Sequence, residues 1–268
     1  MLDSADRDET RFPLANNFQI TRSQSILNGF FTRIGTTEVV LEYKSPNIST
    51  ALANNTLTVD LSGTVSGTIS TTATISTGSY TVAELLDAVA TALTDISGTW
   101  TVSAVAGGGA TLESAADVYV SLGGPVAEAL AIDTALIEVG PTGAVPGLFS
   151  EVYSVDLRPY RYLDFVSQQL TYCQDLKDGA TNITNRDVLC RWYMAWDEAP
   201  QLDTYGFPIL MGYLPFTLRR TFSPPKQIRW DNIQPLGNLT FQVYTDQNVL
   251  APFTTPTQFL MTLQVSEV

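Results

Sequence analysis

Residues 227–244 read QIRWDNIQPLGNLTFQVY, and this stretch is typical of the C-terminal part of the chain. Two short runs of β-branched and aromatic residues, 227–230 and 239–244, stand on either side of the turn-forming cluster Pro235-Leu236-Gly237. β-Branched and aromatic residues favour strands, whereas Pro and Gly favour the turns between strands. The stretch therefore predicts a strand, a turn and a second strand.

The same pattern extends outward along much of the chain. Further strand-like runs lie at 36–43, 152–157, 162–172, 188–196, 209–216 and 258–265, and turn clusters separate most of them. About eight strands with long irregular connections favour a jelly roll or a related β-sandwich. Within 188–196, alternation places Trp192, Met194 and Trp196 on one face, which we expect to pack between two sheets rather than to bind sugars.

The basic residues are distributed unevenly, which indicates a second part of the molecule. No Lys or Arg occurs from Ser45 to Leu157, and this stretch contains eleven acidic residues. It also contains the clearest helix signal, because Thr81 and Glu84 form a T-x-x-E capping box ahead of apolar residues at helical spacing. We expect an inserted module here, and a single domain with uneven charge is the alternative.

These patterns predict a mainly β protein: a single jelly-roll sandwich with an inserted small α+β domain. The expected boundaries are an N-terminal arm at 1–24, a jelly-roll domain at 25–56 and 148–268, and an inserted acidic α+β domain at 57–147. Residues 1–11 alternate acids and bases without an apolar segment, so we expect a solvated arm there and not a signal peptide.

The composition argues against several classes of function. Charged residues make up only 15% of the chain, below the roughly 25% of an average soluble domain, which suits a surface that is buried against neighbours. The net charge of −13 disfavours direct nucleic-acid binding. Histidine is absent, which removes Ser-His-Asp and Cys-His nucleophiles and the usual zinc sites. We therefore expect neither an enzyme nor a cofactor.

One basic region is the candidate interface. Its members are Arg219, Arg220, Lys226, Arg229 and Trp230. Basic residues are scarce in this chain, and Arg beside Trp is favoured at protein interfaces. We expect these residues to meet acidic surface on a partner, such as the acidic module of an adjacent copy. Ordinary solvated charge at strand ends is the alternative.

The remaining polar clusters are expected to be structural. The acids concerned are Asp197, Glu198 and Asp231, which follow strands, and Asp175, Asp178 and Asp187, which lack the spacing of an EF-hand. No metal is therefore expected. Without a secretory signal, Cys173 and Cys190 are expected to be reduced and buried, and a disulfide between them is the alternative.

Three segments carry a resemblance to known proteins. Residues 25–40 read SILNGFFTRIGTTEVV, and residues 223–244 contain P-K-x-I-x-W followed by L-G-N-L-x-F-Q-V-Y. Residues 74–93 (TISTGSYTVAELLDAVATAL) are similar to a unit that many virion structural proteins share. Residues 25–40 and 223–244 resemble the penton or minor capsid proteins of virophages, polinton-like viruses and nucleocytoplasmic large DNA viruses.

The resemblance implies a single jelly roll that forms homopentamers at icosahedral vertices of a virion. It implies a major capsid protein around each pentamer and an insert that points outward as a small external domain. Other minor capsid proteins, and a host receptor contacted through the insert, are further candidate partners. Three alternatives stay open: a spike or receptor-binding protein, another minor capsid protein on the same fold, and a jelly-roll carbohydrate enzyme that uses carboxylates alone.

Overall fold

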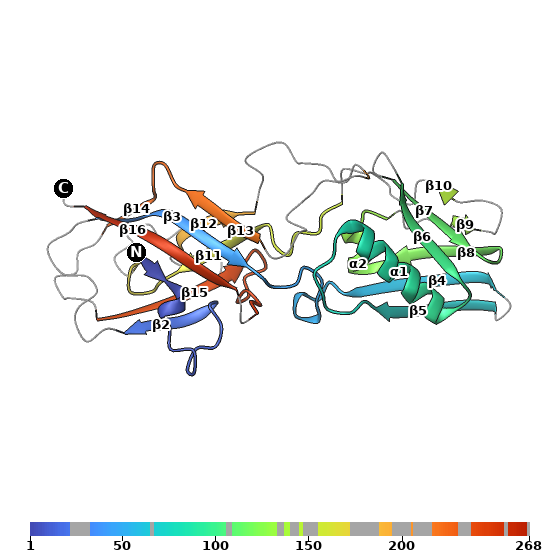
Figure 1. Cartoon of the computed structure of the whole chain (residues 1–268), viewed down its shortest axis with the longest axis horizontal. Helices are drawn as coiled ribbons and strands as arrows, with labels where there is room; N and C mark the ends of the chain where they lie inside the picture. Colours follow the sequence, from blue (N-terminus) through green and yellow to red (C-terminus); the bar gives the residue numbers. More distant parts are fainter. Residues whose placement is uncertain are drawn as a thin grey trace, which may run out of the picture. The chain divides into compact units, whose positions relative to one another are not determined.

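In the computed structural model, the chain divides into two compact units, coloured along the sequence in Figure 1. Unit 1 consists of Met1–Ser45, Tyr160–Ala195 and Pro215–Val268, and unit 2 consists of Pro46–Pro159 and Trp196–Leu214. The structure describes residues 1–21, 33–64, 67–105, 109–132, 137–139, 145–146, 155–171, 188–194, 205, 216–229, 237–254 and 257–266. Each unit is therefore described within these ranges.

Unit 1 contains two antiparallel sheets. The strands of the first follow the order β1 (Leu2–Asp3), β16 (Gln258–Ser266), β3 (Arg33–Tyr43) and β13 (Phe216–Thr221), and β14 (Gln227–Arg229) also pairs with β3. The strands of the second follow the order β12 (Val188–Tyr193), β11 (Tyr162–Val166), β15 (Asn238–Thr245) and β2 (Asn17–Thr21). Their long-range pairings join sequence segments from both ends of the chain.

Phenylalanine side chains join the two sheets of unit 1. Phe259 of β16 lies 5.0 Å from Phe165 of β11 and 5.7 Å from Phe18 of β2, measured between ring centroids. Phe241 of β15 stacks on Phe18 at 5.5 Å. Each buried aromatic side chain of this kind contributes roughly 1.5–3 kcal/mol by leaving water. The two sheets therefore form a sandwich with its core between their inner faces.

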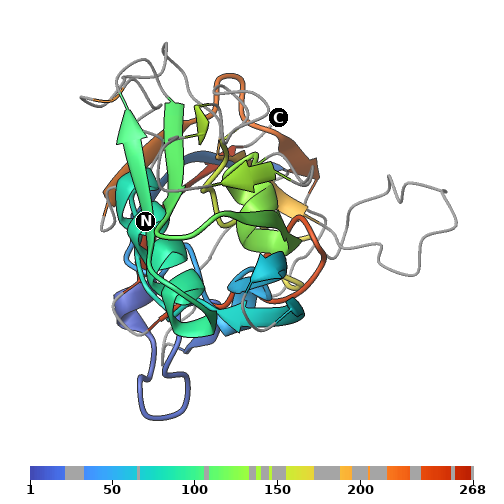
Figure 2. The same cartoon turned by 90° about the vertical axis from the view of Figure 1, so that its right-hand side faces the viewer.

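Unit 2 combines strands with two helices. One sheet follows the order β5 (Gly67–Thr74), β4 (Thr56–Thr64), β8 (Val118–Gly123) and β9 (Ile137–Val139), and another follows β10 (Val145–Pro146), β7 (Gly109–Ser114) and β6 (Trp100–Val105). The helices are α1 (Val82–Ile96) and α2 (Gly124–Ala129), and Figure 2 shows α1 running along the strands. Two short 3-10 turns, Ser4–Asp6 in unit 1 and Thr50–Leu52 in unit 2, complete the elements.

Helix α1 begins where the sequence predicts. The Thr81 hydroxyl accepts the backbone N–H of Glu84, and the Glu84 carboxylate accepts the backbone N–H of Thr81 at 2.8 Å. The apolar side of the helix, with Leu85, Leu86 and Val89, packs into one core with the inward residues of β4. Unit 2 therefore has a hydrophobic core of its own.

The predicted fold class, mainly β with a jelly-roll sandwich and an inserted α+β part, is confirmed. Some local predictions are wrong. Residues 155–157 form no strand, β13 runs from Phe216 to Thr221 and so passes the predicted end at 216, and β2 lies within the predicted arm. The short helix α2 begins at Gly124, and Pro125 in its first turn is compatible with a helix start.

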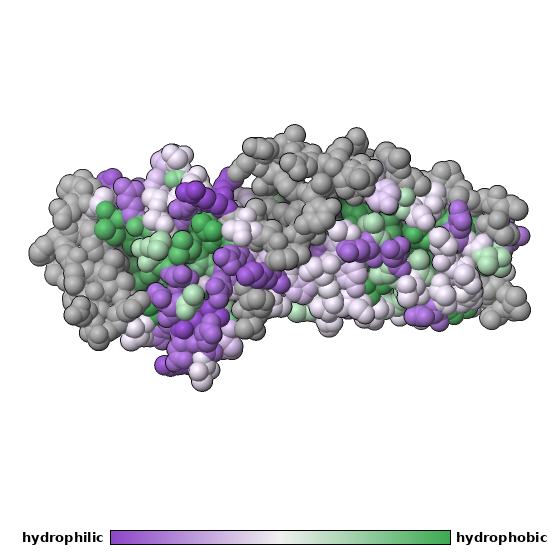
Figure 3. All heavy atoms as spheres, in the orientation of Figure 1, coloured by the Kyte–Doolittle hydropathy of each residue, from purple (hydrophilic) through white to green (hydrophobic). Residues whose placement is uncertain are grey.

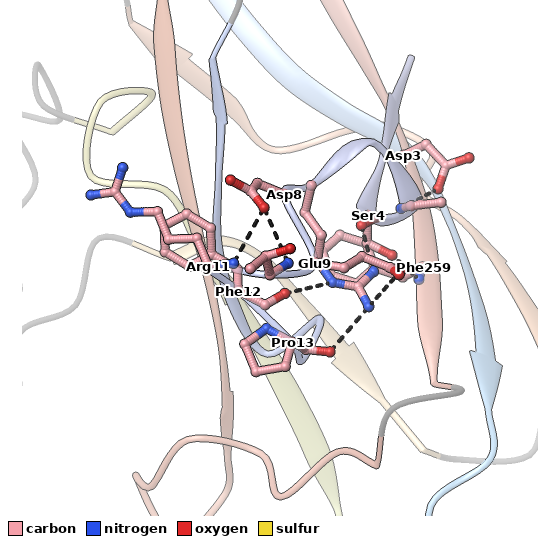
Figure 4. Close-up of polar contacts among 11 residues, drawn as sticks. Asp3, Ser4, Asp8, Glu9, Arg11, Phe12, Pro13 and Phe259 are labelled. Atoms are coloured by element: carbon pink, nitrogen blue, oxygen red, sulfur yellow. Dashed lines mark hydrogen bonds and ion pairs between the residues drawn. The ribbon is translucent and has the colours of Figure 1, made fainter.

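The solvated start predicted for residues 1–11 is also wrong. β1 pairs with β16, and the Arg7 side chain is 0% exposed. The Arg7 guanidinium donates to the carbonyl oxygens of Ser4 (2.7 Å), Phe12 (3.0 Å) and Pro13 (3.2 Å), and the dashed lines in Figure 4 mark such bonds. A buried cation is tolerated because these carbonyls replace its lost water.

The segment is also joined directly to the core strand β16. The Ser4 hydroxyl accepts the backbone N–H of Phe259 at 2.8 Å, and Asp3 accepts the N–H of Ala5 at 2.8 Å. Glu9 forms an ion pair with Arg7 at 3.3 Å from the solvent side. The first residues of the chain therefore belong to the sandwich, where β1 forms an edge of the first sheet.

Candidate functional site

The structure brings most of the predicted basic residues along one strand. Arg219 and Arg220 belong to β13, and Arg229 ends β14, which Lys226 directly precedes. Both strands pair with β3: Arg219 lies opposite Val40, Arg220 opposite Val39, and Arg229 opposite Arg33. The basic residues, although separated in sequence, thus lie along one edge of the first sheet, where β13 and β14 both pair with β3. Trp230 lies outside the described residues.

These bases differ in their surroundings. Arg219 forms an ion pair with Glu38, yet its side chain stays 70% exposed, so the pair contributes at most about 1 kcal/mol to stability. Lys226 donates from Nζ to the carbonyl oxygen of Val188 at 2.8 Å, which ties the loop before β14 to β12. Arg219 therefore keeps most of its charged side chain exposed to solvent.

A second cluster, missed in the sequence, lies on the outward face of the other sheet. We call it the tyrosine cluster, and its members are Tyr162, Asp164, Arg191 and Tyr193. Strands β11 and β12 place Tyr162 opposite Tyr193 and Asp164 opposite Arg191. Alternation along 188–196 marks Arg191 and Tyr193 as the face opposite Trp192, but only the pairing register brings them to Tyr162 and Asp164.

The tyrosine cluster is held by several contacts at once. Arg191 donates from Nε to Asp164 Oδ1 at 2.7 Å and from Nη2 to Oδ2 at 2.9 Å. Its Cζ lies 4.0 Å from the centre of the Tyr162 ring, a cation–π contact. Tyr162 meets Tyr193 edge to face at 5.7 Å. These bonds to Asp164 raise the pKa of Arg191, so the guanidinium stays charged and fixed in place.

The cluster is accessible from solvent. Tyr193 is 52% exposed and the Arg191 side chain 40%, whereas the Asp164 side chain is 10% exposed. Trp192 and Met194, on the other side of the same strand, are buried, which confirms the predicted core face for these two residues. Trp196 lies outside the described residues. Strand β12 thus contributes to the core on one side and offers aromatic surface on the other.

The buried thiol and phenol groups of unit 1 stay protonated near neutral pH. Burial raises the pKa of the Cys190 thiol to about 12 and the pKa of Tyr160 to about 12, and it also raises the pKa of Tyr43. Cys190 is reduced and buried, as predicted, whereas Cys173 lies outside the described residues. A thiol with such a raised pKa stays protonated near neutral pH and is a poor nucleophile.

The acids that are expected to be structural, Asp175, Asp178, Asp187, Asp197, Glu198 and Asp231, lie outside the described residues. Within the described ranges, no three His, Cys, Asp or Glu side chains gather closely enough to hold a metal ion. The helices in the same ranges are too short or too polar to cross a membrane.

Comparison with known proteins identifies the type of fold. No protein-family model matches the sequence, and no curated protein matches it. Among solved structures, the chain resembles one over nearly its whole length. That structure is the crystal structure of the mavirus penton protein, with a TM-score of 0.55, 11% sequence identity, and coverage of 94% of this chain and 91% of that chain. The chain therefore has a penton-like fold.

Proposed function

We propose that this chain is a viral capsid structural protein, the penton protein that forms homopentamers at the icosahedral vertices of a virion. The observation that carries the proposal is the likeness to the mavirus penton protein over 94% of this chain and 91% of the other. A likeness over nearly the full length of both chains covers the sandwich strands and the inserted part together. The proposed role is structural and requires no catalysis.

The proposed partners are further copies of the chain, the major capsid protein around the vertex, and other minor capsid proteins. The low charge content, 15%, supports extensive contact with neighbours, because few ionic groups need to be desolvated. The alternative is that this chain is another minor capsid protein on the same fold, and the symmetry of its assembly separates the two roles.

In this proposal the jelly roll, 25–56 and 148–268 with the N-terminal residues 1–24, builds the shell. The inserted acidic domain, 57–147, points outward. The basic edge of β13 and β14 contacts a partner through the following residues: Arg219, Arg220, Lys226, Arg229 and Trp230. The exposure of Arg219 supports this assignment, since a weak surface ion pair leaves its guanidinium accessible to a partner.

Native mass spectrometry and electron-microscopy class averages of the purified chain test the proposal. We expect rings with five-fold symmetry, and co-purification with the major capsid protein when the two are produced together. A chain that stays monomeric at high concentration and does not associate with a major capsid protein would contradict the vertex role.

A receptor-binding role for the insert is the second candidate, and one observation favours it. Unit 2 has its own core, which includes Leu57, Leu85 and Trp100, so it can carry a separate function. Removal of residues 57–141 separates the candidates. Particles that assemble but lose attachment to host cells indicate receptor binding, whereas loss of assembly indicates that the insert is needed to build the vertex.

A further inference from the structure

Unit 1 presents two outward sheet faces of different chemistry. On the first sheet, four side chains form a row across four strands, and we call them the aliphatic row: Asp3, Leu260, Val40 and Arg219. The pairing register places Asp3 beside Leu260, Leu260 beside Val40, and Val40 beside Arg219. Their strand neighbours Met261, Val39 and Leu41 are buried, so the row faces away from the core.

The aliphatic row combines apolar and charged surface. Val40 and Leu260 are half-buried at its centre, and the exposed Arg219 stands at one end. Glu42, two residues along β3 from Val40, is 49% exposed on its side chain. Figure 3 shows hydrophobic surface over the region of β3 and β16, next to strongly hydrophilic surface. The row therefore offers aliphatic contact area with a guanidinium and a carboxylate at its border.

The tyrosine cluster lies on the opposite outward face of the same sandwich. Its exposed Tyr193 ring and the Tyr162 ring beside it present aromatic surface, and Arg191 and Asp164 hold the cluster in one arrangement. Side chains that are already immobilised lose little conformational entropy on binding. Tyr and Arg are also the residues that most often dominate the binding energy of protein interfaces.

The two surfaces complement each other in three respects. Aromatic rings pack well on aliphatic side chains such as Val40 and Leu260. A guanidinium like that of Arg219 is attracted to the face of a tyrosine ring. The third respect is charge: the Arg191 guanidinium, which Asp164 and Tyr193 hold in place, is 40% exposed and opposite in charge to the Glu42 carboxylate, whose partner within its own chain is Lys44.

Ring symmetry requires such a pair of different surfaces. In a cyclic assembly each copy contacts its two neighbours through two distinct patches, one for each side, whereas a two-fold dimer uses the same patch twice. The aliphatic row and the tyrosine cluster lie on opposite faces of one sandwich. A single copy can therefore engage one neighbour with the first and another neighbour with the second.

We propose that the occupant of the tyrosine cluster is a second copy of this chain: the aliphatic row of one copy packs on the tyrosine cluster of the next, with Arg219 over the Tyr193 ring. This inference rests on the proposed homopentamer and assigns the surfaces that close it. Arg219 thereby gains a specific partner, Tyr193 of the neighbouring copy, in addition to its own Glu38.

The experiment uses one blocked variant for each surface. Leu260→Glu disables the row and leaves the tyrosine cluster intact, and Tyr193→Glu does the reverse. We expect each variant alone to be monomeric by native mass spectrometry. An equimolar mixture should stop at heterodimers, because the one intact row meets the one intact cluster and the ring cannot close. Only a head-to-tail contact between these two surfaces gives this result.

Controls separate misfolding from loss of contact. Thr21→Glu, at an exposed position of β2 in the same sheet as Tyr193, should leave the pentamer intact, and Tyr193→Phe, which keeps the ring, should do so as well. If Leu260→Glu or Tyr193→Glu unfolds, judged by circular dichroism, Leu260→Ser and Tyr193→Ser replace them in the same mixture.

The outcomes are distinct. A wild-type chain that forms no pentamer contradicts the proposed function itself. A wild-type pentamer that persists in both blocked variants overturns the assignment of the surfaces and leaves the pentamer standing. Folded single variants that are monomeric but give no heterodimer when mixed show that row and cluster do not meet each other, which also overturns the inference.

Discussion

The hydroxyl groups of Tyr43 and Tyr160 lie 3.2 Å apart, although 117 positions separate the two residues in the chain. Tyr43 ends β3, just before the chain leaves unit 1, and Tyr160 is the residue with which it returns. Their rings also meet edge to face at 6.1 Å. The exit and the re-entry of the chain are therefore joined inside unit 1 itself.

We expect unit 1 to fold without residues 46–159. A short Gly-Ser linker in their place connects two ends whose neighbouring side chains, Tyr43 and Tyr160, are already in contact, and a shorter loop costs less entropy to close. Circular dichroism should show a β-rich spectrum with cooperative unfolding, and hydrogen exchange should protect the β3 and β16 amides. A shortened chain without cooperative unfolding would show that unit 1 needs the insert.

Alkaline pH should destabilise unit 1. The folded protein holds the Cys190 and Tyr160 protons more tightly than the unfolded chain, since burial raises both pKa values to about 12 from ordinary values of 9.0 and 10.0. This stability is therefore complete below about pH 9 and is lost as the pH rises toward 12. Between its ordinary pKa of 10.0 and its pKa of about 12 in the folded protein, Tyr160 alone accounts for a loss on the order of 3 kcal/mol in the free energy of unfolding.

Urea unfolding measured from pH 7 to pH 11 checks this expectation. Tyr160→Phe should make the free energy of unfolding less dependent on pH above pH 10, while Tyr80→Phe in unit 2 serves as the control. An unchanged slope in Tyr160→Phe would show that Tyr160 does not carry the alkaline loss.

Arg7→Met should lower the free energy of unfolding by about 3 kcal/mol, because the buried carbonyl oxygen of Ser4 and the partly buried ones of Phe12 and Pro13 lose their donor. Hydrogen exchange of the Phe259 amide should quicken too, since Ser4, which accepts this N–H, is held by Arg7. The exposed Arg11 provides the matched control, and Arg11→Met should change stability by less than about 0.5 kcal/mol. Equal effects of the two substitutions would refute the anchoring role.

Thr81→Ala should destabilise unit 2 by about 1 kcal/mol through loss of the helix cap. Thr91→Ala, in the middle of α1, should have the opposite sign, with a gain of about 0.5 kcal/mol, because Ala has the higher helix propensity. Thermal unfolding of both variants measures the difference. Two shifts of the same sign would contradict the assigned cap.

Local sequence signals predicted the parts of the fold that depend on local chemistry. The capping box of Thr81 and Glu84 and the alternation around Trp192 required only neighbouring residues. The N-terminal segment was mispredicted because its charges indicate solvent, whereas Arg7 is buried against carbonyl oxygens that residues 4–13 themselves supply. Such a contact depends on how the loop closes, which no periodicity reveals.

The candidate surfaces also depend partly on local sequence and partly on long-range strand pairing. The basic residues of 219–229 could be read from composition, but their alignment along β3 depends on two separate strand pairings. The tyrosine cluster needs the register between β11 and β12, which are separated by 21 positions in sequence. A shift of that register by one residue would turn Tyr193 toward the core and break the cluster.

The edge strand β5 has a consequence for handling the protein. β5 lies at the end of its sheet, and Gly67–Thr74 contains neither a charged residue nor a proline, the features with which many proteins keep edge strands from pairing with other molecules. Its backbone can template a further strand once crowding or partial unfolding brings two molecules together. Fibrillar aggregation during concentration of the protein should therefore begin at β5. The substitution Thr72→Lys, which places a charge on this strand, should suppress the aggregation.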